Sequence, residues 1–405
     1  MTNLGAVRRD FMKVFVIDGF LLNLRLQQKN ASMKFNIDGK LLQQQLSAVN
    51  KVINSKNALT ILDNFLFELE GNILTITGSD QENTVKAKLE VLDSDGTGQI
   101  AIPAKTLLEI IKEISNQPVS FALNDQTGEI DLQFMNGKFR FMGINADEFP
   151  KGDNLEDEAL SFTVPASVIL KGIEKTVYAV SQETIRPIMT GIYWDIHEND
   201  IVFVASDTHK LVRYITKEVS PGFERGFIIP SKPANILKNI IGKEDVVNIR
   251  IGEKGASFSF GDFTLTCRFI KGNYPNYNRV IPTDNPYTVT VDRQSLLNAM
   301  RRVAIFASKA SNLVKIEMQQ GMMRLAAQDL DYGTSAEERV MCDYQGNDMT
   351  IGFNSAFTVE ILNNIGGEST VIKLSDPARP GIFEPLEQEP NTELTTIQMP
   401  MQVIE

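Results

Sequence analysis

The feature that most constrains the fold of this chain is a threefold internal repeat. Three copies of one pattern begin near Phe35, Phe162 and Tyr287, at offsets of 127 and 125 residues along the 405-residue sequence. Each copy is long enough to bury a core of its own, so the repeat predicts a row of similar domains. Any fold assigned to the chain must therefore be one that can be built three times.

Each copy opens with a short alternating strand, followed by apolar residues at helical spacing. The alternating residues are Phe35 and Ile37, then Phe162 and Val164, then Tyr287, Val289 and Val291. The helical sets are Leu42, Leu46, Val49 and Ile53, then Ile173, Val177 and Val180, then Leu296, Met300 and Val303. This order predicts an amphipathic helix whose apolar face packs on a sheet, with the opposite face left exposed.

A second strand in each copy ends at an aspartate, namely Asp80, Asp207 or Asp329, and another strand–helix pair follows. Phe35 precedes Asp80 by 45 residues, and Phe162 precedes Asp207 by the same 45. The 23 residues from Asp80 to Pro103 also recur in the second copy. The third copy differs by two or three residues, as loops allow.

These patterns predict an α+β fold of three repeated domains, with helices on one face of antiparallel sheets. We expect the domains at residues 33–155, 156–284 and 285–405, because the segments between them are polar and contain proline. Residues 1–32 are set apart from the repeats, and we expect them to be a poorly ordered leader before Met33.

Composition excludes several classes of protein. The formal charge is −11, so the chain lacks the overall basic character of a conventional DNA-binding protein. Only two cysteines occur, Cys267 and Cys342, which argues against a disulfide scaffold or a zinc cluster and favours two buried thiols in a reducing compartment. No apolar run approaches the roughly 20 residues that span a bilayer. We therefore expect a cytoplasmic location, with no metal and no cofactor.

Three segments carry a family resemblance: Ser206–Leu211, Tyr274–Pro282 and the tail Met399–Met401. In this order, and together with the three repeats, they resemble the bacterial DNA polymerase III beta subunit, or beta sliding clamp, family from Met33 to the end. The resemblance implies a non-enzymatic processivity factor for DNA replication. Its subunits form a head-to-tail homodimer, a closed six-domain ring around duplex DNA, which an ATP-using clamp loader opens.

The resemblance also implies a peptide-binding pocket between the second and third domains. It receives a short extended motif, a Gln followed by Leu and Phe, from the replicative polymerase, the clamp loader and other partners. The matching positions are Met189, Ser206, Thr208, His209, Lys210, Leu211, Pro275, Arg279, Val280, Asn354, Phe357, Gly381, Met399, Pro400 and Met401. The family often has Gly at the position of Thr208 and Tyr at that of Phe357, which puts the motif preference in doubt.

The family places its helices toward the DNA, and the predicted helices here carry basic residues. The candidates are Lys40, Lys51, Lys56, Lys105, Lys112, Lys171, Lys175, Lys232, Lys238, Arg301 and Arg302, with Lys56 the strongest single match. Lysines suit a sliding protein because they attract phosphates without reading bases. The alternative is that these are the ordinary wet faces of helices.

Ring closure requires an adhesive edge at each end of the chain. The alternation in Lys138-Phe139-Arg140-Phe141 puts both phenyl rings on one face of a strand. Ile305 and Phe306 match the opposing patch of the family. The alternative is that Phe139 and Phe141 belong to an ordinary half-buried strand.

Two rival functions remain at this point. Asp207 and His209 are close enough in sequence to suggest a hydrolase, although no Gly-x-Ser-x-Gly nucleophile turn is present. The second rival is a peptide-binding scaffold with no role on DNA, which the acidic charge would permit.

Overall fold

The computed structural model describes residues 33–150, 160–242 and 245–403; the leader predicted over residues 1–32 lies outside this part. The chain divides into two compact units. One comprises Met1–Asp157 with Ser257–Cys267, and the other comprises Glu158–Ala256 with Arg268–Glu405. The third repeat and most of the second thus share one unit, while Ser257–Cys267 of the second repeat belongs to the other. Within the described ranges, no helix is long and apolar enough to cross a membrane.

The first repeat follows the predicted order of strands and helices, with two helices and two sheets. Its elements are β1 (Met33–Asp38), α2 (Gly39–Val49), η1 (Asn50–Val52), η2 (Thr60–Asp63), β2 (Asn64–Glu70), β3 (Ile73–Ser79), β4 (Asn83–Glu90), β5 (Asp93–Gly96), β6 (Gly98–Pro103), α3 (Ala104–Ile114), β7 (Pro118–Leu123), β8 (Glu129–Phe134), β9 (Gly137–Met142) and η3 (Ala146–Glu148). One sheet has the order β5-β1-β7-β8-β9, and the other contains the run β4-β3-β2-β6.

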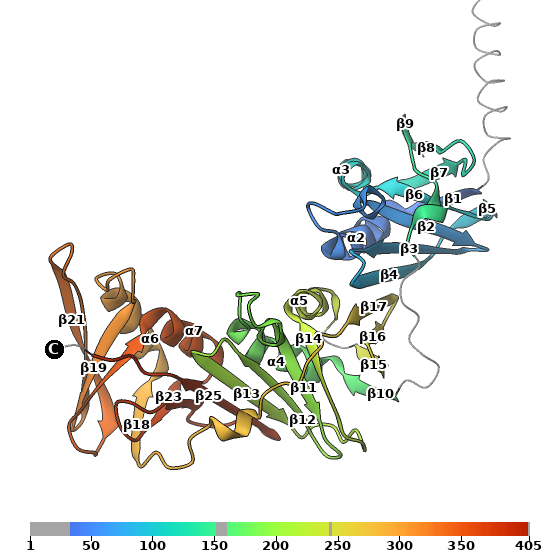
Figure 1. The fold of residues 1–405 in the computed structure, drawn as a ribbon. Coiled ribbons are helices and arrows are strands. Elements are labelled where there is room, and N and C mark those ends of the chain that lie inside the picture. The colour runs from blue at the N-terminus through green and yellow to red at the C-terminus, as the bar shows by residue number, and fades with distance from the viewer. Residues whose placement is uncertain (1–32, 151–159, 243–244, 404–405) are drawn as a thin grey trace, which may run out of the picture. The chain divides into compact units, whose positions relative to one another are not determined.

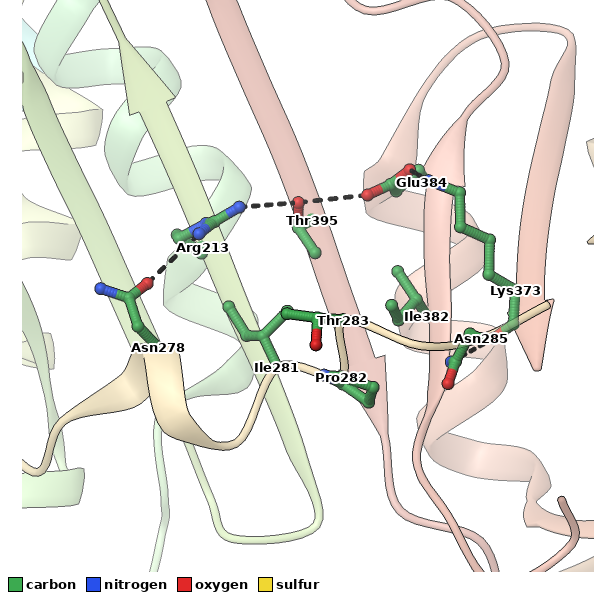
Figure 2. Close-up of a pocket in the computed structure, with 10 residues that line it drawn as sticks. All are labelled: Arg213, Asn278, Ile281, Pro282, Thr283, Asn285, Lys373, Ile382, Glu384 and Thr395. Carbon is green, nitrogen blue, oxygen red and sulfur yellow. Dashed lines mark hydrogen bonds and ion pairs between the residues drawn. The ribbon is translucent and has the colours of Figure 1, made fainter. Parts of the chain in front are cut away.

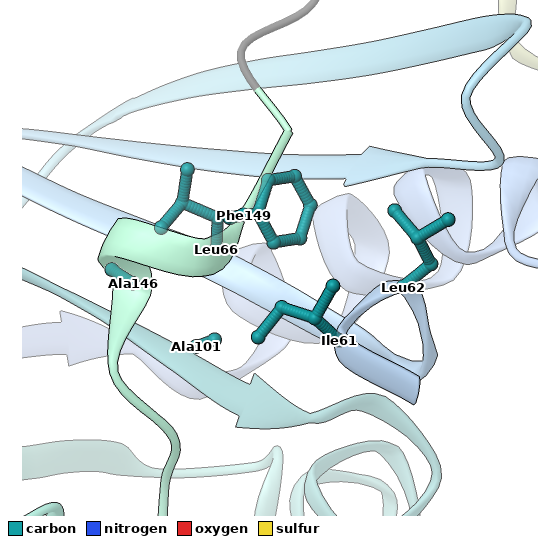
Figure 3. Close-up of a cluster of buried hydrophobic side chains, with 6 residues drawn as sticks. All are labelled: Ile61, Leu62, Leu66, Ala101, Ala146 and Phe149. Atoms are coloured by element: carbon teal, nitrogen blue, oxygen red, sulfur yellow. The ribbon is translucent and has the colours of Figure 1, made fainter. Parts of the chain in front are cut away.

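Apolar faces of the helices form the core of this repeat. Leu42 and Leu46 of α2 and Leu107 of α3 are fully buried, and α2 packs beside α3. Phe35 of β1 stacks on Phe121 of β7 with ring centroids 4.9 Å apart. A smaller cluster joins the 3-10 turns η2 and η3 to β2 and β6 and is shown in Figure 3; its residues are Ile61, Leu62, Leu66, Ala101, Ala146 and Phe149. The predicted apolar helix stripe is therefore the core-forming surface.

The second repeat has the same order of elements. These are β10 (Leu160–Pro165), α4 (Ala166–Thr176), η4 (Val177–Ala179), η5 (Pro187–Met189), β11 (Gly191–Ile196), β12 (Ile201–Ser206), β13 (Lys210–Thr216), β14 (Arg225–Pro230), α5 (Ser231–Ile240), β15 (Val246–Ile251), β16 (Gly255–Phe260), β17 (Phe263–Arg268) and η6 (Tyr277–Arg279). β10 pairs with β15, and β17 pairs with β4 of the first repeat.

The third repeat completes the pattern. Its elements are β18 (Tyr287–Asp292), α6 (Arg293–Ala304), β19 (Leu313–Gln319), β20 (Met322–Asp329), β21 (Thr334–Tyr344), β22 (Met349–Asn354), α7 (Ser355–Ile365), β23 (Ser369–Leu374), β24 (Gly381–Pro385) and β25 (Thr392–Gln398). All three copies therefore carry the predicted strand–helix pair twice.

A single twelve-stranded sheet joins the second and third repeats. Its order is β14-β11-β12-β13-β25-β24-β23-β18-β21-β20-β19-β22. The junction is the antiparallel pair β13–β25, in which Leu211 lies opposite Ile397. Helices α4, α5, α6 and α7 lie along one side of this unit (Figure 1), and α4 contacts α7 across the junction.

Two predicted helices end earlier than the apolar spacing suggests. Ile53 lies beyond α2, and Val177 and Val180 lie beyond the end of α4. In both cases a 3-10 turn continues the chain, and its tighter winding keeps Val52 and Ala179 buried. Side-chain hydroxyls also bond back to the helix near these ends, from Ser47 to Gln43 O and from Thr176 to Gly172 O, an interaction that bends helices.

The repeated aspartate has a structural role in all three copies. The Asp80 side chain accepts the backbone N–H of Asn83 at 2.7 Å, and that of Asp207 accepts the N–H of Lys210 at 2.8 Å. Asp329 accepts the N–H groups of the residues two and three positions on. Each carboxylate thus closes the turn between two strands of its sheet, as short polar side chains commonly do.

Candidate functional site

The predicted peptide site is centred on the turn between β12 and β13. Ser206 accepts the N–H of Thr208 at 3.1 Å and donates its hydroxyl proton to Lys210 O at 2.9 Å. Thr208 lies at φ +76°, in the left-handed region that favours glycine. The turn presents the exposed residues Thr208 and His209 beside α7.

A buried lysine connects this turn to the third repeat. The Lys210 side chain is only 4% exposed, and its amine lies 2.5 Å from Asp207 Oδ2 and 2.9 Å from Glu360 Oε2. The same amine lies 4.3 Å from the centroid of the Phe357 ring, and the His209 ring stacks on Phe357 at 5.6 Å. Phe357 therefore forms one wall of the site, held by a cation and an imidazole.

These contacts exclude the hydrolase reading of Asp207 and His209. Both Asp207 oxygens are engaged, Oδ1 by the backbone N–H groups of His209 and Lys210 and Oδ2 by the Lys210 amine. The carboxylate thus closes a turn and neutralises a buried cation instead of orienting an imidazole, which a triad would require.

The C-terminal segment forms another wall. The Met399 N–H donates to His209 O at 2.8 Å, and the Met401 N–H donates to Gly352 O at 2.8 Å. Gln398 is fully buried, and its amide donates to Asn354 O. Because these bonds reach both repeats, they fix Met399, Pro400 and Met401 at the junction.

Asn354 stabilises the start of α7, the helix that carries Phe357. Its side chain accepts the N–H groups of Ala356 and Phe357, so it is the N-cap of α7. Its amide also donates to Ser311 O at 3.1 Å. Asn354 therefore positions Phe357 through the helix start.

The floor of the site is an apolar cluster on the opposite side of the sheet from the helices. Its buried members are Val202, Val204, Leu211, Tyr277, Ile382 and Ile397, with Tyr193, Ile215, Tyr274 and Ile281 packed against it. Tyr193 and Tyr274 stack with their ring planes 2° apart, and burial raises the pKa of Tyr193 to about 12. Of the predicted pocket residues only Leu211 belongs to this cluster.

The remaining predicted pocket residues are placed as follows. Pro275, Arg279 and Val280 lie exposed in the segment around η6 that leads from Tyr274. Gly381 is buried in β24, where a side chain would come within 3.0 Å of Phe353 and Leu374, so it serves packing. Met189 is half-buried in η5, and its carbonyl accepts the N–H of Ser181.

Sequence reasoning missed Tyr193, Ile382 and Ile397. Tyr193 on β11 is far in sequence from Ile382 on β24 and Ile397 on β25. The pairings β11–β12, β12–β13, β13–β25 and β24–β25 bring the three residues into one sheet. The alternation of Leu211, Arg213 and Ile215 along β13 was the one available signal, since it places three side chains on one face.

Most of the predicted DNA-facing residues are exposed on helices or next to them. Lys40 is on α2, Lys51 on η1, Lys105 and Lys112 on α3, and Lys238 on α5, while Lys56 follows η1. These six side chains form no ion pair in the described part of the chain. Their charges are thus available to an external anion.

Two of the predicted cations are engaged within the molecule. The Lys175 amine donates to Asn364 O at 2.9 Å and Ile365 O at 3.1 Å, the last carbonyls of α7, and burial lowers its pKa. Lys171 pairs with Glu389 at 2.9 Å, and this hydrogen bond raises the lysine pKa. We remove both from the predicted DNA-contacting set, because their charges already have partners.

The remaining basic candidates, Arg301, Arg302 and Lys232, also differ in whether they have a partner within the molecule. Arg302 forms a salt bridge with Glu338 at 2.5 Å, whereas exposed Arg301 donates to the side chain of Asn363 at 2.9 Å. Lys232 at the start of α5 is half-buried. Arg301 has no acidic partner among the residues that the structure describes, and it remains a candidate.

The predicted seam residues belong to the first and third repeats. Phe139 and Phe141 are on β9, the edge strand of its sheet, and Phe139 is 39% exposed. Lys138 and Arg140 on the same strand both pair with Asp131 of β8, in agreement with the predicted alternation. Ile305 and Phe306 follow α6 and are 68% and 38% exposed.

The geometry defines a protein of three similar α+β repeats, with an apolar cluster at the junction of the last two. Comparison with known sequences matches the three domains of the DNA polymerase III beta subunit in order. The N-terminal domain matches residues 33–155, the central domain residues 163–276 and the C-terminal domain residues 278–402. The chain therefore belongs to the DNA polymerase III beta subunit family.

Individual relatives agree over nearly the whole chain. The beta sliding clamp of Pseudomonas aeruginosa is 26% identical over 92% of this chain and 100% of its own length. That of Caulobacter vibrioides is 28% identical over 86% of this chain and 95% of its own.

Solved structures extend this likeness to the fold. The P. aeruginosa sliding clamp bound to griselimycin superposes with a TM-score of 0.87 at 25% identity, over 92% of this chain and 100% of that one. The Thermotoga maritima beta subunit superposes with a TM-score of 0.85, also at 25% identity and with the same coverage.

Proposed function

We propose that this protein is a DNA sliding clamp, a processivity factor that encircles duplex DNA and tethers the replicative polymerase, the clamp loader and other partners. It performs no catalysis, and we place it in the cytoplasm. The single observation that carries the proposal is the way equivalent strands are paired between the repeats. Two of the three equivalent junctions are made within one chain, and the strands of the third are left open.

The equivalence follows from the order of elements. Strands β4, β13 and β21 occupy the same place in their repeats, and so do the final strands β9, β17 and β25. β4 pairs with β17, joining the first repeat to the second, and β13 pairs with β25, joining the second to the third. By the same rule β21 should pair with a β9, and the β9 that completes a closed arrangement belongs to another copy.

Both of these strands have an unpaired edge among the described residues. β9 pairs only with β8, and residues 334–341 of β21 pair only with β20, because β18 reaches only Cys342–Tyr344. Open strand edges are adhesive surfaces that proteins normally cover. Two copies related head to tail would satisfy both edges twice and close a ring of six domains.

Apolar side chains accompany both open edges. Phe139 and Met142 are exposed on β9, and Ile305, Phe306 and Met341 are exposed on the third repeat. Burying side chains of this size contributes about 1.5–3 kcal/mol each. This contribution supports a durable dimer seam.

A ring that encloses DNA needs only weak attraction to phosphates. We propose that Lys40, Lys51, Lys56, Lys105, Lys112, Lys238 and Arg301 supply it. Phosphate contacts carry no sequence information, so such a surface allows movement along the duplex. The acidic balance of the whole chain, −11, keeps DNA from binding elsewhere on the protein.

The junction of the second and third repeats is the proposed partner site. An extended peptide with Gln, Leu and Phe would place its apolar residues on the floor at Leu211 and beside the Phe357 wall. Met399 and Met401 adapt to such side chains because methionine is flexible and polarizable. The polar groups of His209 and Arg279 are available at the rim.

The mass and shape of the purified particle test this proposal. Light scattering should give twice the 45.2 kDa of one chain, and electron microscopy should show a ring with an opening that admits a DNA duplex. A particle that is monomeric at micromolar concentration, or a dimer with no central opening, would refute the ring.

A further inference from the structure

A polar cavity lies beside the apolar floor of the proposed peptide site and has an unused cation. The cavity has a volume of about 450 Å³ and is shown in Figure 2. Its polar lining includes Arg213, Asn278, Asn285, Lys373, Glu384 and Thr395, and its apolar lining includes Ile281, Pro282 and Ile382. All of these residues belong to the unit that contains the third repeat and most of the second.

The guanidinium of Arg213 is the unused cation. It donates to Asn278 Oδ1 at 3.2 Å and to Thr395 Oγ1 at 3.4 Å, both of which are neutral. Its Nε is buried and has no acceptor within the described residues. A buried donor without an acceptor costs free energy, and for a charged group the cost is larger. Arg213 is therefore incompletely satisfied in the free protein.

The other charges of the cavity cancel one another. Lys373 and Glu384 form an ion pair at 2.7 Å, and the second oxygen of Glu384 accepts the Thr395 hydroxyl at 3.3 Å. The charge of Arg213 remains, and the cavity is positive in a chain of net charge −11. The missing partner of Arg213 is therefore an anion.

A second polar atom of the cavity without a hydrogen-bond partner, Asn285 Oδ1, indicates that the ligand also carries a hydrogen-bond donor. The Asn285 amide donates to Lys373 O at 2.9 Å and to Pro380 O at 3.2 Å, which fixes its orientation. Its Oδ1 is buried with no donor inside the described part of the chain. Arg213 and Asn285 lie at opposite ends of the cavity, with Ile281 and Pro282 between them (Figure 2). The cavity thus requires an acceptor at one end and a donor at the other.

We propose that this cavity binds an acidic residue of the partner peptide, its carboxylate on Arg213 and a backbone N–H toward Asn285. The inference rests on the proposed partner site. It is supported by continuity with that site, because Ile382 lines the cavity and also belongs to the apolar floor. Leu211 and Arg213 are two residues apart on one face of β13, a separation of roughly 7 Å.

The acidic residue therefore lies within one or two positions of an apolar anchor of the motif. Arginine is well suited to this role because its planar group can bind a carboxylate through two donors. The cavity would add preference among partners that share the same Gln, Leu and Phe residues.

Fluorescence anisotropy with the full-length protein and labelled peptides tests the inference. The probe is a peptide with the Gln, Leu and Phe motif, in which Glu is placed at each neighbouring position in turn. Each peptide is compared with the same peptide carrying Gln at that position. At one position we expect the Glu form to bind about three- to tenfold more tightly, the range for a partly exposed charge-assisted contact.

The variant Arg213→Gln should bring the ratio of the two affinities to about one, and measurable binding of the Gln peptide shows that the site is folded. Lys217→Gln is the matched control, because Lys217 follows β13 and pairs with Glu393 outside the cavity. Equal affinity of Glu and Gln peptides at every position, or a preference that persists in Arg213→Gln, would overturn the inference. Failure of every motif peptide to bind would instead refute the proposed partner site.

Inorganic phosphate provides a further arm of the experiment. If the cavity bound small anions in general and not a peptide carboxylate, phosphate at millimolar concentration would bind through Arg213 while the Glu and Gln peptides bound equally well. That result would overturn the assignment to a peptide carboxylate. Selective loss of the Glu preference with rising salt would support it.

Discussion

At the residue scale, the site depends on a few charged side chains that are buried, whereas side chains of the same type are exposed elsewhere in the protein. Lys210 is the clearest case, since its amine is buried between two carboxylates and an aromatic ring. Removing one partner of a buried ion pair strongly lowers the free energy of unfolding, because the other charge is left buried and unpaired. An exposed ion pair contributes little to the free energy of unfolding. The chain offers both situations at the two ends of β13.

Replacing Lys210 with alanine should destabilise the protein by about 2–3 kcal/mol, because half-buried Asp207 loses the buried cation that it pairs with. The matched variant is Lys217→Ala, which removes an exposed pair with Glu393 and should cost less than about 1 kcal/mol. Urea denaturation of both variants measures the two values. Equal losses would show that the Lys210 network is not a buried one.

Thr208 is strained by its backbone conformation, at φ +76°. A residue with a Cβ in the left-handed region pays about 1–2 kcal/mol, of which glycine recovers part after its own entropic cost. Thr208→Gly should therefore stabilise the protein by about 0.5 kcal/mol, measured as a higher denaturation midpoint. Thr208→Ala retains the Cβ and should give no gain; a gain equal to that of glycine would contradict the explanation.

At the scale of elements, the repeat predicted from spacing alone accounts for the order of strands and helices. The turn aspartates Asp80 and Asp207 fall at the predicted ends of β3 and β12. Spacing could not reveal contacts between elements far apart in sequence. Lys175 was predicted to face DNA as one of the basic residues on the helices, yet its partners are the carbonyls of residues 364 and 365.

The same limit applies to the site. The wall residue Phe357 and the floor residue Leu211 could be assigned from the family resemblance. Arg213 could not, because one arginine on an alternating strand is ordinary until β25 pairs beside it. Pairing across 182 residues brings Arg213 to Thr395.

Lys175 should stabilise the junction of the second and third repeats by satisfying the C-terminal carbonyls of α7. Lys175→Met removes the donors with little change in size, and we expect a loss of about 1–2 kcal/mol. Faster amide hydrogen exchange in the last turn of α7 would locate the effect. The neighbouring variant Lys171→Met should leave that exchange unchanged, and similar acceleration in both would contradict the capping role.

At the scale of the whole molecule, the strand pairing between repeats leaves β9 and β21 of one chain without the partner strands that the other junctions have. The family match over residues 33–155, 163–276 and 278–402 and the open edges of β9 and β21 lead to the same assembly. Weak phosphate contacts suffice for such a protein, because its attachment to DNA comes from enclosure.

The seam itself can be broken by one charge. Phe306→Asp places a carboxylate in the apolar patch, and we expect a monomer by light scattering at concentrations where the unmodified protein is a dimer. Leu386→Asp is the control, since Leu386 is 52% exposed on the third repeat but lies away from β21, between β24 and β25. A full-strength dimer of the Phe306 variant would show that the seam lies elsewhere.

Retention on circular and linear DNA tests enclosure most directly. The protein is loaded on nicked circular plasmid by its clamp loader and ATP, isolated by gel filtration, and the plasmid is then cut once with a restriction enzyme. The account predicts that the protein stays with the circle at moderate salt and leaves after linearisation. Equal retention on circular and cut DNA, falling steeply with salt as for an open binding surface, would contradict it.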